Sequence, residues 1–401
     1  MADREPDSKL YEHADPLDAL NWSVPLDQKL ASIHAALYTQ IEFVDRISIA
    51  AYDPATDLLK TFLASSPGAN HLVRYEAPLA ESPSLAEILR AGRPRVVNDL
   101  ELFRQGRHLH TRVIAEEGFR WSYTFPMYLD GTFWGFIFFN SRTPGALAEP
   151  ALRTLDVYAH LISAVVTAEM LAVRILAAAV KTAHDMVHFR DPETGNHLDR
   201  MARYARLIAQ RLAATGAASL DDAAIERIFE FAPLHDIGKL AVPDRILLKP
   251  GRLSEAEREE MKQHTVRGLE MIEAIAHNFG LEHLDGLDLL RHIAELHHET
   301  MDGSGYPHGL HAGEIPLEAR IVAVADVFDA LTSPRPYKPS WTDEEAFAWL
   351  RKLSRSKFDQ DCVDALLFNA KKVKEIQAKF QDPGTDLPPG REKNGSEIVS
   401  E

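Results

Sequence analysis

The sequence is poor in cysteine and has fewer basic than acidic residues. Its 401 residues include one cysteine, Cys362, which excludes a disulfide framework and a cysteine-rich zinc site. Lys and Arg total 44 against 60 Asp and Glu, so the formal net charge is −16. Because a nucleic-acid polymer is bound through basic surface that neutralises its phosphates, we expect no partner of that class. A small anion held by a few local cations is compatible with this charge.

The sequence shows neither a signal-peptide pattern nor an uninterrupted apolar stretch that could span a membrane. The residues after Met1 do not show the basic and then apolar order of a secretory leader. The most apolar long stretch, 161–180, contains Glu169 and Arg174, and a span of about 20 apolar residues rarely carries two charges. Apolar residues make up 45% of the chain, which is typical of a globular protein. We therefore expect a soluble, cytoplasmic protein with no membrane segment.

Two different patterns divide the chain. Apolar runs at 122–129 and 132–140 flank Asp130-Gly131 and predict a β-hairpin. From residue 190 onward the pattern is helical, with almost no strand signal. Further expected elements are a helix over 26–43, strands at 46–52, 58–64 and 95–98, and a helix over 150–190. The predicted domains are a polar tail (1–24), an α+β domain (25–155), a connecting helix (156–188), an all-α domain (189–378) and a disordered tail (379–401).

The connecting helix carries a seam of uncharged residues spaced by three and four. The seam consists of Tyr158, Leu161, Val165, Ala168, Ala172, Ile175, Ala179 and Thr182. Such spacing is typical of parallel coiled coils and favours a homodimer. The alternative is an ordinary helix packed against its own domain.

Histidine is concentrated in one third of the chain, since 12 of the 18 histidines lie between His184 and His311. Imidazole is a common metal ligand. The pair His235-Asp236 follows a helical run, and adjacent histidine and aspartate can both bind metal, with the carboxylate able to bridge two cations. The dipeptide alone is weak evidence, because it recurs at His184-Asp185.

Four further features strengthen the case for a metal centre. Glu193 and His197 are one helical turn apart and can face one point. His264 lies within a helical run and His297-His298 ends another. Asp326 lies in the apolar run 321–328, where a buried carboxylate is costly without a cation. The sequence therefore predicts a cluster of imidazoles and carboxylates around metal.

Three segments, 235–239 (HDIGK), 297–307 (HHETMDGSGYP) and 325–338 (ADVFDALTSPRPYK), resemble the HD-GYP family. Its members are HD-type metallohydrolases that hydrolyse the bacterial second messenger cyclic di-GMP, to pGpG or GMP. The resemblance covers about residues 183–375. It implies two or three divalent metals, commonly iron or manganese, and Glu193 matches the residue associated with a third metal, which favours a trinuclear site. The metal ligands it implies are Glu193, His197, His235, Asp236, His264, His297, His298 and Asp326.

The same resemblance implies the residues that meet the substrate. Lys239, Arg335 and Lys338 match phosphate-contacting cations, and Tyr306 lines the substrate pocket. The residues expected to carry the chemistry are Asp236, as bridging carboxylate, and Lys239, which can neutralise developing charge. Two departures are a proline at 334, where many members have aspartate, and a longer link at 277–290.

Alternatives to cyclic di-GMP hydrolysis stay open at this point. One is hydrolysis of another cyclic dinucleotide, such as 3′,3′-cGAMP, or of a mononucleotide, against which the GYP segment argues. Another is a receptor or scaffold without turnover, although an idle site has no need of eight matched ligands. Glu299 and Asp302 either orient ligands or are solvated. The histidines expected to play no part in the metal site are His184, His188, His277, His283, His292, His308 and His311.

The first half, over about residues 25–165, is similar to a GAF domain in its order of helices and strands and in its 130–131 hairpin. GAF domains sense small molecules or dimerise. No cysteine lies in this half, which excludes a thioether-linked bilin, and the ligand is not specified; His108 and His110 are expected to be exposed. The expected fold is thus an α+β GAF domain joined by a long helix to an all-α HD-type metallohydrolase domain. Because that helix leads to Glu193 and His197, it is also the expected route of regulation.

Overall fold

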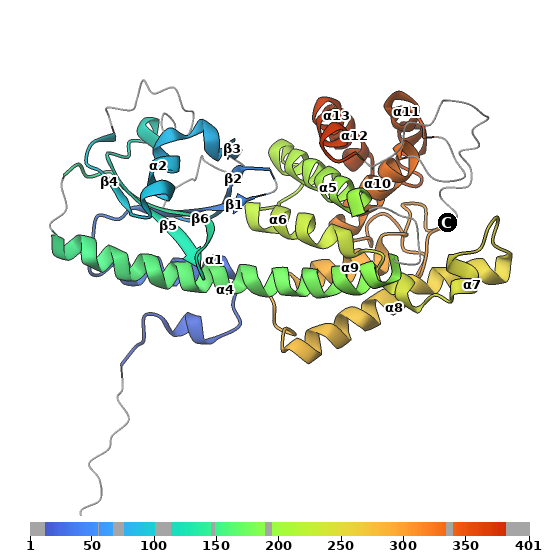
Figure 1. The fold of residues 1–401 in the computed structure, drawn as a ribbon, viewed down its shortest axis with the longest axis horizontal. Coiled ribbons are helices and arrows are strands. Elements are labelled where there is room, and N and C mark those ends of the chain that lie inside the picture. The colour runs from blue at the N-terminus through green and yellow to red at the C-terminus, as the bar shows by residue number, and fades with distance from the viewer. Residues whose placement is uncertain are drawn as a thin grey trace, which may run out of the picture. The chain divides into compact units, whose positions relative to one another are not determined.

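The computed structural model of the chain describes residues 13–54, 56–66, 76–100, 114–145, 149–188, 195–333 and 340–381. For residues 180, 181 and 183–188 the description covers the backbone alone. The chain forms two compact units, 1–167 and 168–401 (Figure 1), and each is considered by itself.

The first unit is built on one antiparallel sheet with strand order β3-β2-β1-β6-β5-β4. All five expected strands are present, and one short strand, β3, was not expected. The strands are β1 (Arg46–Asp53), β2 (Leu58–Ser65), β3 (Glu76–Pro78), β4 (Arg95–Val97), β5 (Trp121–Leu129) and β6 (Thr132–Ser141). The predicted hairpin joins β5 to β6 through Asp130 (φ 48°) and Gly131 (φ 76°), which is the left-handed pair that a tight two-residue turn needs.

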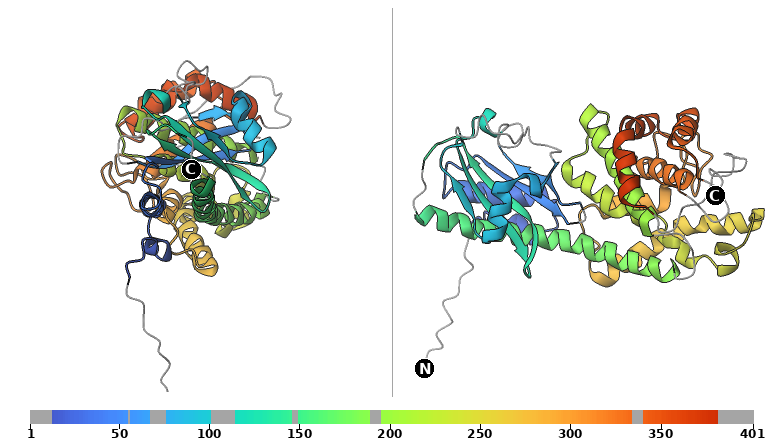
Figure 2. Two further views of the ribbon diagram at one scale, coloured as in Figure 1. Left: turned by 90° about the vertical axis from the view of Figure 1, so that its left-hand side faces the viewer. Right: turned by 45° about the horizontal axis from the view of Figure 1, so that its top comes forward.

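Helices cover both faces of this sheet (Figure 2). On one face lie α1 (Leu26–Tyr38) and the first part of α4 (Glu149–His188), where the Tyr123 hydroxyl donates to Asp156 and the Phe125 ring meets His160 edge-on. On the other face, α2 (Pro83–Ala91) packs against β2 and β6. Two 3₁₀ turns, η1 (Asp18–Asn21) and η2 (Leu79–Glu81), complete the unit's described elements.

The helix predicted over 26–43 is shorter than expected and ends at Tyr38. The amides of Gln40 and Ile41 both donate to the carbonyl of Leu37, so the last turn tightens instead of continuing. The chain then turns into β1. Hydrophobic spacing alone did not reveal this stop, because Ile41 and Val44 continue the apolar pattern and are buried although they lie beyond the helix.

The second unit is all-α, as expected: residues 195–333 and 340–381 contain isolated β-bridges but no strand. Its helices are α5 (Gly195–Thr215), α6 (Asp222–Phe231), η4 (Ala232–Leu234), η5 (Ile237–Ala241), α7 (Asp244–Leu247), α8 (Glu255–Phe279), α9 (Leu287–Leu296), α10 (Leu317–Thr332), α11 (Asp343–Leu353), α12 (Gln360–Phe368) and α13 (Ala370–Lys379). They enclose one large apolar core, whose fully buried members include Tyr204, Phe231 and Phe328.

The long helix α4 runs through the boundary between the units. Among the described residues it is the one helix long and apolar enough to cross a membrane, over Glu149–Ala179. Its most apolar window has a mean hydropathy of 1.9, and 33% of that window is buried. Core helices of soluble proteins pass the same test. Within the first unit α4 buries Leu155 and Ile162, and within the second it buries Val173 and Leu176.

Candidate metal centre

Five segments of the second unit converge on one point. His197 stands in the first turn of α5, and His235-Asp236 joins η4 to η5. His264 lies in the middle of α8, His297-His298 follows α9, and Asp326 lies in α10. A close approach of η5 to α8 makes this possible at Gly238, where a Cβ atom would lie 1.7 Å from the His264 carbonyl oxygen. Any other residue at 238 would separate Asp236 from His264.

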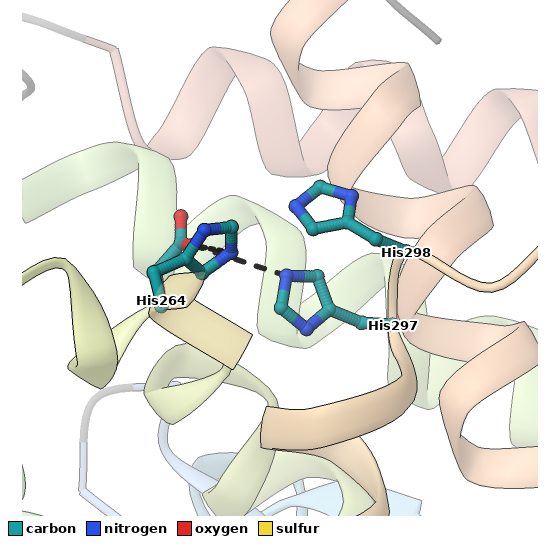
Figure 3. A group of neighbouring side chains, drawn as sticks. His264, His297 and His298 are labelled. Atoms are coloured by element: carbon teal, nitrogen blue, oxygen red, sulfur yellow. Dashed lines mark ion pairs between the residues drawn. The ribbon is translucent and has the colours of Figure 1, made fainter. Parts of the chain in front are cut away.

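The converging side chains form two groups, each able to offer its ligand atoms within 4.8 Å of one another. The first group contains Asp236, His264, His297 and His298, and the second contains His197, His235 and Asp326. Figure 3 shows the rings of His264, His297 and His298 turned toward one another from α8 and from the chain after α9. Seven of the eight predicted ligands are therefore brought together. The eighth, Glu193, lies outside the described residues.

Asp236 lies between the two groups. Its Oδ1 is 3.4 Å from Nε2 of His264 and 3.8 Å from Nε2 of His297, whereas its Oδ2 is 3.1 Å from Nε2 of His235. Two ligands that bind one cation at about 2.0–2.2 Å lie roughly 3.0–3.6 Å apart. The observed separations fall in or just above that range, and the carboxylate faces both groups as a bridging ligand would.

The outer nitrogen of three of these rings is already committed to a backbone carbonyl. His235 Nδ1 lies 3.0 Å from the carbonyl of Ala232, His264 Nδ1 lies 2.8 Å from that of Met261, and His297 Nδ1 lies 2.9 Å from that of Ile293. A carbonyl can only accept, so each Nδ1 carries the proton and each neutral ring turns the lone pair of Nε2 inward. This tautomer is the one that binds metal through Nε2.

Burial and charge keep four of these groups in the protonation states that metal binding requires. Burial lowers the pKa of His264, and lowers the pKa values of His297 and His298 well below the ordinary range, so these rings are neutral at pH 7. Burial would raise the pKa of Asp236, but Lys239 and His235 outweigh it and hold that pKa well below its usual value. The carboxylate is therefore ionised.

Without a cation these inward atoms are unsatisfied. The buried atoms Nε2 of His235, His264 and His297 and Oδ1 of Asp236 have no hydrogen-bond partner among the described residues. Lone pairs directed at one another in a buried site are costly. A divalent cation removes this cost, and the donor set of imidazole and carboxylate, with no thiolate, suits a first-row metal such as manganese or iron. The residues present thus fit the divalent metal that an HD domain implies.

One wall of the site is the segment that follows His298. The Tyr306 ring lies nearly parallel to that of His298, with centroids 4.7 Å apart, and meets His264 edge-on. The buried Glu299 carboxylate accepts the amides of His308, Gly309 and Leu310. The role of Glu299, left open by the sequence, is thus to hold this loop. Asp302, equally left open, lies farther along the loop, where it pairs with Lys357 at 3.0 Å and accepts from Thr300 and Ser304.

The predicted substrate cations are only partly placed. Lys239 Nζ lies 2.7 Å from Asp236 Oδ2, at the edge of the metal groups. Arg335 and Lys338, with the proline at 334, lie outside the described residues. Three of the histidines not assigned to the site pair with a glutamate: His277 with Glu282, His292 with Glu318 and His308 with Glu295. The side chains of His184 and His188 lie outside the description.

Sequence reasoning missed Asp329, which is fully buried and accepts from Nδ1 of His197 at 2.7 Å. It also missed Arg200, which pairs with Asp329. A signal was present, since Asp329 follows Asp326 by three residues in an apolar helix, so that both carboxylates face the same side.

Comparison with known proteins agrees with this architecture. A GAF domain model matches residues 26–166 and an HD domain model matches residues 181–362. The fold and the site thus define a GAF domain followed by a metal-binding HD domain.

Curated relatives narrow the class. The chain is 32% identical over 388 residues to the cyclic di-GMP phosphodiesterase response regulator RpfG of Xanthomonas campestris, covering 95% of this chain and 85% of that protein. It therefore belongs to the HD-GYP family of cyclic di-GMP phosphodiesterases. It is 41% identical to a probable cyclic di-GMP phosphodiesterase of Vibrio cholerae, over 54% of this chain and 49% of that protein. It is also 36% identical to 3′3′-cGAMP-specific phosphodiesterase 2 of the same organism, over 49% of this chain and 35% of that protein. The chain thus spans half or less of the length of these two relatives.

Proposed function

We propose that this chain is a metal-dependent phosphodiesterase that hydrolyses cyclic di-GMP to pGpG or GMP and is regulated by its GAF domain. The observation that carries the proposal is the placement of the Asp236 carboxylate between two groups of inward-facing imidazoles. A phosphodiester resists attack by neutral water. Divalent metals bound at such a site would supply Lewis acidity, which would make hydroxide available from water at neutral pH.

The chain's own residues hold and orient the reactants. Asp236, His264, His297 and His298 would hold one metal, and His197, His235, Asp236 and Asp326 the other. Lys239, whose ammonium lies beside Asp236, would neutralise charge on the phosphate or on the leaving 3′-oxygen. Tyr306, stacked on His298, would contact a guanine or the ribose–phosphate backbone. Arg335 and Lys338 would bind the far phosphate.

We propose iron or manganese as the metal, with Glu193 as ligand of a third ion. The all-nitrogen-and-oxygen donor set supports this identity over a thiolate-binding metal. Elemental analysis of protein purified without oxygen measures both the identity and the number of metals per chain.

The decisive experiment compares wild type with Asp236→Ala, and with Asp288→Ala as a control, because Asp288 is an exposed aspartate of the same unit. Wild type and control should contain two or three metals per chain and hydrolyse cyclic di-GMP. Asp236→Ala should lose both properties, since it removes the carboxylate that faces both groups. Metal-loaded wild type that leaves cyclic di-GMP intact would refute the proposal, and would favour a receptor.

A second candidate substrate is 3′,3′-cGAMP. The chain is 36% identical to a relative named as specific for that dinucleotide, which supports testing 3′,3′-cGAMP as a substrate. Both substrates present the same phosphodiester to the metals and differ in one base. Competition between the two in one reaction, measured as the ratio of kcat/KM values, distinguishes the two assignments.

We further propose a homodimer formed through α4. Its solvent-facing residues make an apolar stripe with strict three-four spacing: Val157, Leu161, Ala164, Ala168, Leu171, Ile175, Ala178 and Thr182. Four positions of this stripe are the same as in the seam expected from sequence. The other four lie one residue earlier, as Val157 does relative to Tyr158. Val157 is 66% exposed whereas Tyr158 is 9% exposed, and Leu171 and Ile175 are 37% and 42% exposed. Pairing of two such stripes would cover apolar surface that a monomer leaves in water.

A charged pair in the stripe tests the dimer. Leu171→Glu with Ile175→Glu should give monomers in analytical ultracentrifugation, while Arg153→Gln, exposed on the same helix but outside the stripe, should leave the dimer intact. A wild type that is monomeric at tens of micromolar would refute this part of the proposal. Because α4 buries residues in both cores and carries Glu169 and Arg174, we propose that the protein is cytoplasmic, with α4 as a dimer helix rather than a membrane span.

A further inference from the structure

The last described residues of the chain lie against the helix that carries His197. Asn196 Nδ2 donates to the carbonyl of Gln381 at 2.7 Å, and Arg200 Nη1 donates to the carbonyl of Phe380 at 2.8 Å. The guanidinium of Arg203 lies over the Phe380 ring, 4.3 Å from its centroid. Three successive turns on one face of α5 therefore hold the segment that follows α13.

Arg200 joins this segment to α10. Its Nε donates to Oδ1 of Asp329 at 2.7 Å and its Nη2 to Oδ2 at 3.0 Å, a two-point contact that fixes the carboxylate plane. Nη2 also donates to Ser333 Oγ at 2.8 Å. Arg200 is 4% exposed and Asp329 is fully buried, so each depends on the other to avoid an uncompensated buried charge.

Asp329 in turn holds a metal ligand. Its Oδ2 accepts from Nδ1 of His197 at 2.7 Å, and the opposite ring nitrogen, Nε2, lies 3.7 Å from Oδ1 of Asp326. The other three rings with a committed Nδ1 use a carbonyl three or four residues earlier in the chain. His197 differs from these three rings, because its Nδ1 pairs with a carboxylate on another helix, that of Asp329 in α10.

From this chain of contacts we propose that Asp329 and Arg200 are positioning residues for His197, and that the carbonyl of Phe380 completes their support. The segment Phe380–Gln381 is then part of the metal site, although it lies far from His197 in sequence. Loss of the Phe380 carbonyl removes one acceptor from the buried Arg200 guanidinium, which allows the Arg200–Asp329 pair to shift. The inference rests on the proposed metal centre, but not on the identity of the substrate.

The experiment compares chains that end at Gln381 and at Lys379, together with Asp329→Ala and Asp329→Asn in the full chain. Mn²⁺ binding is titrated on metal-stripped protein, and thermal stability is recorded without metal. The chain ending at Gln381 keeps every contact described above and should bind Mn²⁺ like the full chain. Two proteins should bind one Mn²⁺ equivalent at least tenfold more weakly: the chain ending at Lys379 and the full chain with Asp329→Ala. This is the effect expected when a residue that orients a metal ligand is lost. The other equivalent should be unchanged.

Asp329→Asn supplies the rescue. Its amide oxygen still accepts from Nδ1 of His197, so the weakened equivalent should recover most of its affinity even if the melting temperature falls. A purely structural role would instead lower both Mn²⁺ affinities together with the melting temperature, or would leave both affinities unchanged, and either result overturns the inference. Absence of Mn²⁺ binding by the full chain overturns the metal centre itself. Normal binding without turnover of cyclic di-GMP overturns the proposed activity alone.

Discussion

Replacement of Glu299 should loosen the loop that carries Tyr306 without removing metal. Its carboxylate accepts three consecutive amides, with Oε1 2.7 Å from His308 N and 3.1 Å from Gly309 N, and Oε2 2.9 Å from Leu310 N. The side chain is 4% exposed. The same loop carries Tyr306, which packs on His298. One buried carboxylate thus closes the loop that places the tyrosine.

The magnitude follows from the number of hydrogen bonds. In Glu299→Ala three amides lose a charged acceptor but regain water as the loop opens, so each costs about 1 kcal/mol and the unfolding free energy falls by about 3 kcal/mol. Ordering one backbone residue costs about 1–2 kcal/mol, so if the substrate must re-order Tyr306, KM should rise about tenfold or more. Glu299→Gln keeps one acceptor oxygen and should give an intermediate effect.

The assay combines urea unfolding, KM for cyclic di-GMP and metal content. Glu314→Gln is the matched control, because Glu314 belongs to the same segment but is exposed and accepts a single amide, that of His311. The control should change stability and KM little. An unchanged KM in Glu299→Ala, despite reduced stability, would show that the loop does not position the substrate. Loss of metal would show that Glu299 supports the ligands instead.

Three further predictions concern other parts of the chain. Gly238→Ala should abolish metal binding, measured by elemental analysis, because its Cβ would lie 1.7 Å from the His264 carbonyl; normal metal content would contradict the close approach of η5 to α8. On acidification, the His197–His235–Asp326 group should lose Mn²⁺ first. Burial lowers the pKa of His235, but the charges of Asp236 and Asp326 outweigh burial and raise this pKa overall. Burial lowers the pKa values of His264, His297 and His298. Protons therefore compete with Mn²⁺ at a higher pH in the group that contains His235, and simultaneous loss of both Mn²⁺ ions in a pH-stepped titration would contradict this reasoning. Gly135→Ala should destabilise the sheet, because its φ is +146° and its Cβ would lie 2.0 Å from the Ala50 carbonyl oxygen, and calorimetry should show this with metal content unchanged.

The convergence of these imidazoles and carboxylates was predictable because residue type, order and spacing all carry information about chemistry. An aspartate in the apolar run around Asp326 demands a cation or another partner, and the pairs at 235–236 and 297–298 place ligands at helix ends. Resemblance to a family then selected these residues from among 18 histidines. His277 and His292, which were expected to play no part in the metal site, make ion pairs outside the two groups of candidate ligands.

The exposed face of α4 was predicted less accurately, since several positions of the seam are shifted by one. Sequence shows that Val157 and Tyr158 are both apolar, but the side that stays in solvent is decided by what packs on the helix. Tyr158 is covered and Val157 is left exposed. Periodicity gives the width of an apolar surface on a helix, whereas its phase against the core comes from tertiary packing.

The four histidines with a committed Nδ1 show where local sequence stops being sufficient. Three of them are oriented by carbonyls three or four residues earlier, at Ala232, Met261 and Ile293, so their orientation is set wherever the local backbone forms. The Nδ1 of His197 pairs instead with the carboxylate of Asp329, which is 132 residues away. Its orientation is therefore acquired only when α10 and the segment after α13 have packed against α5. A ligand fixed by long-range contacts is the one whose position other parts of the chain can alter, and so the metal group that contains His197 is the part of the site most open to control.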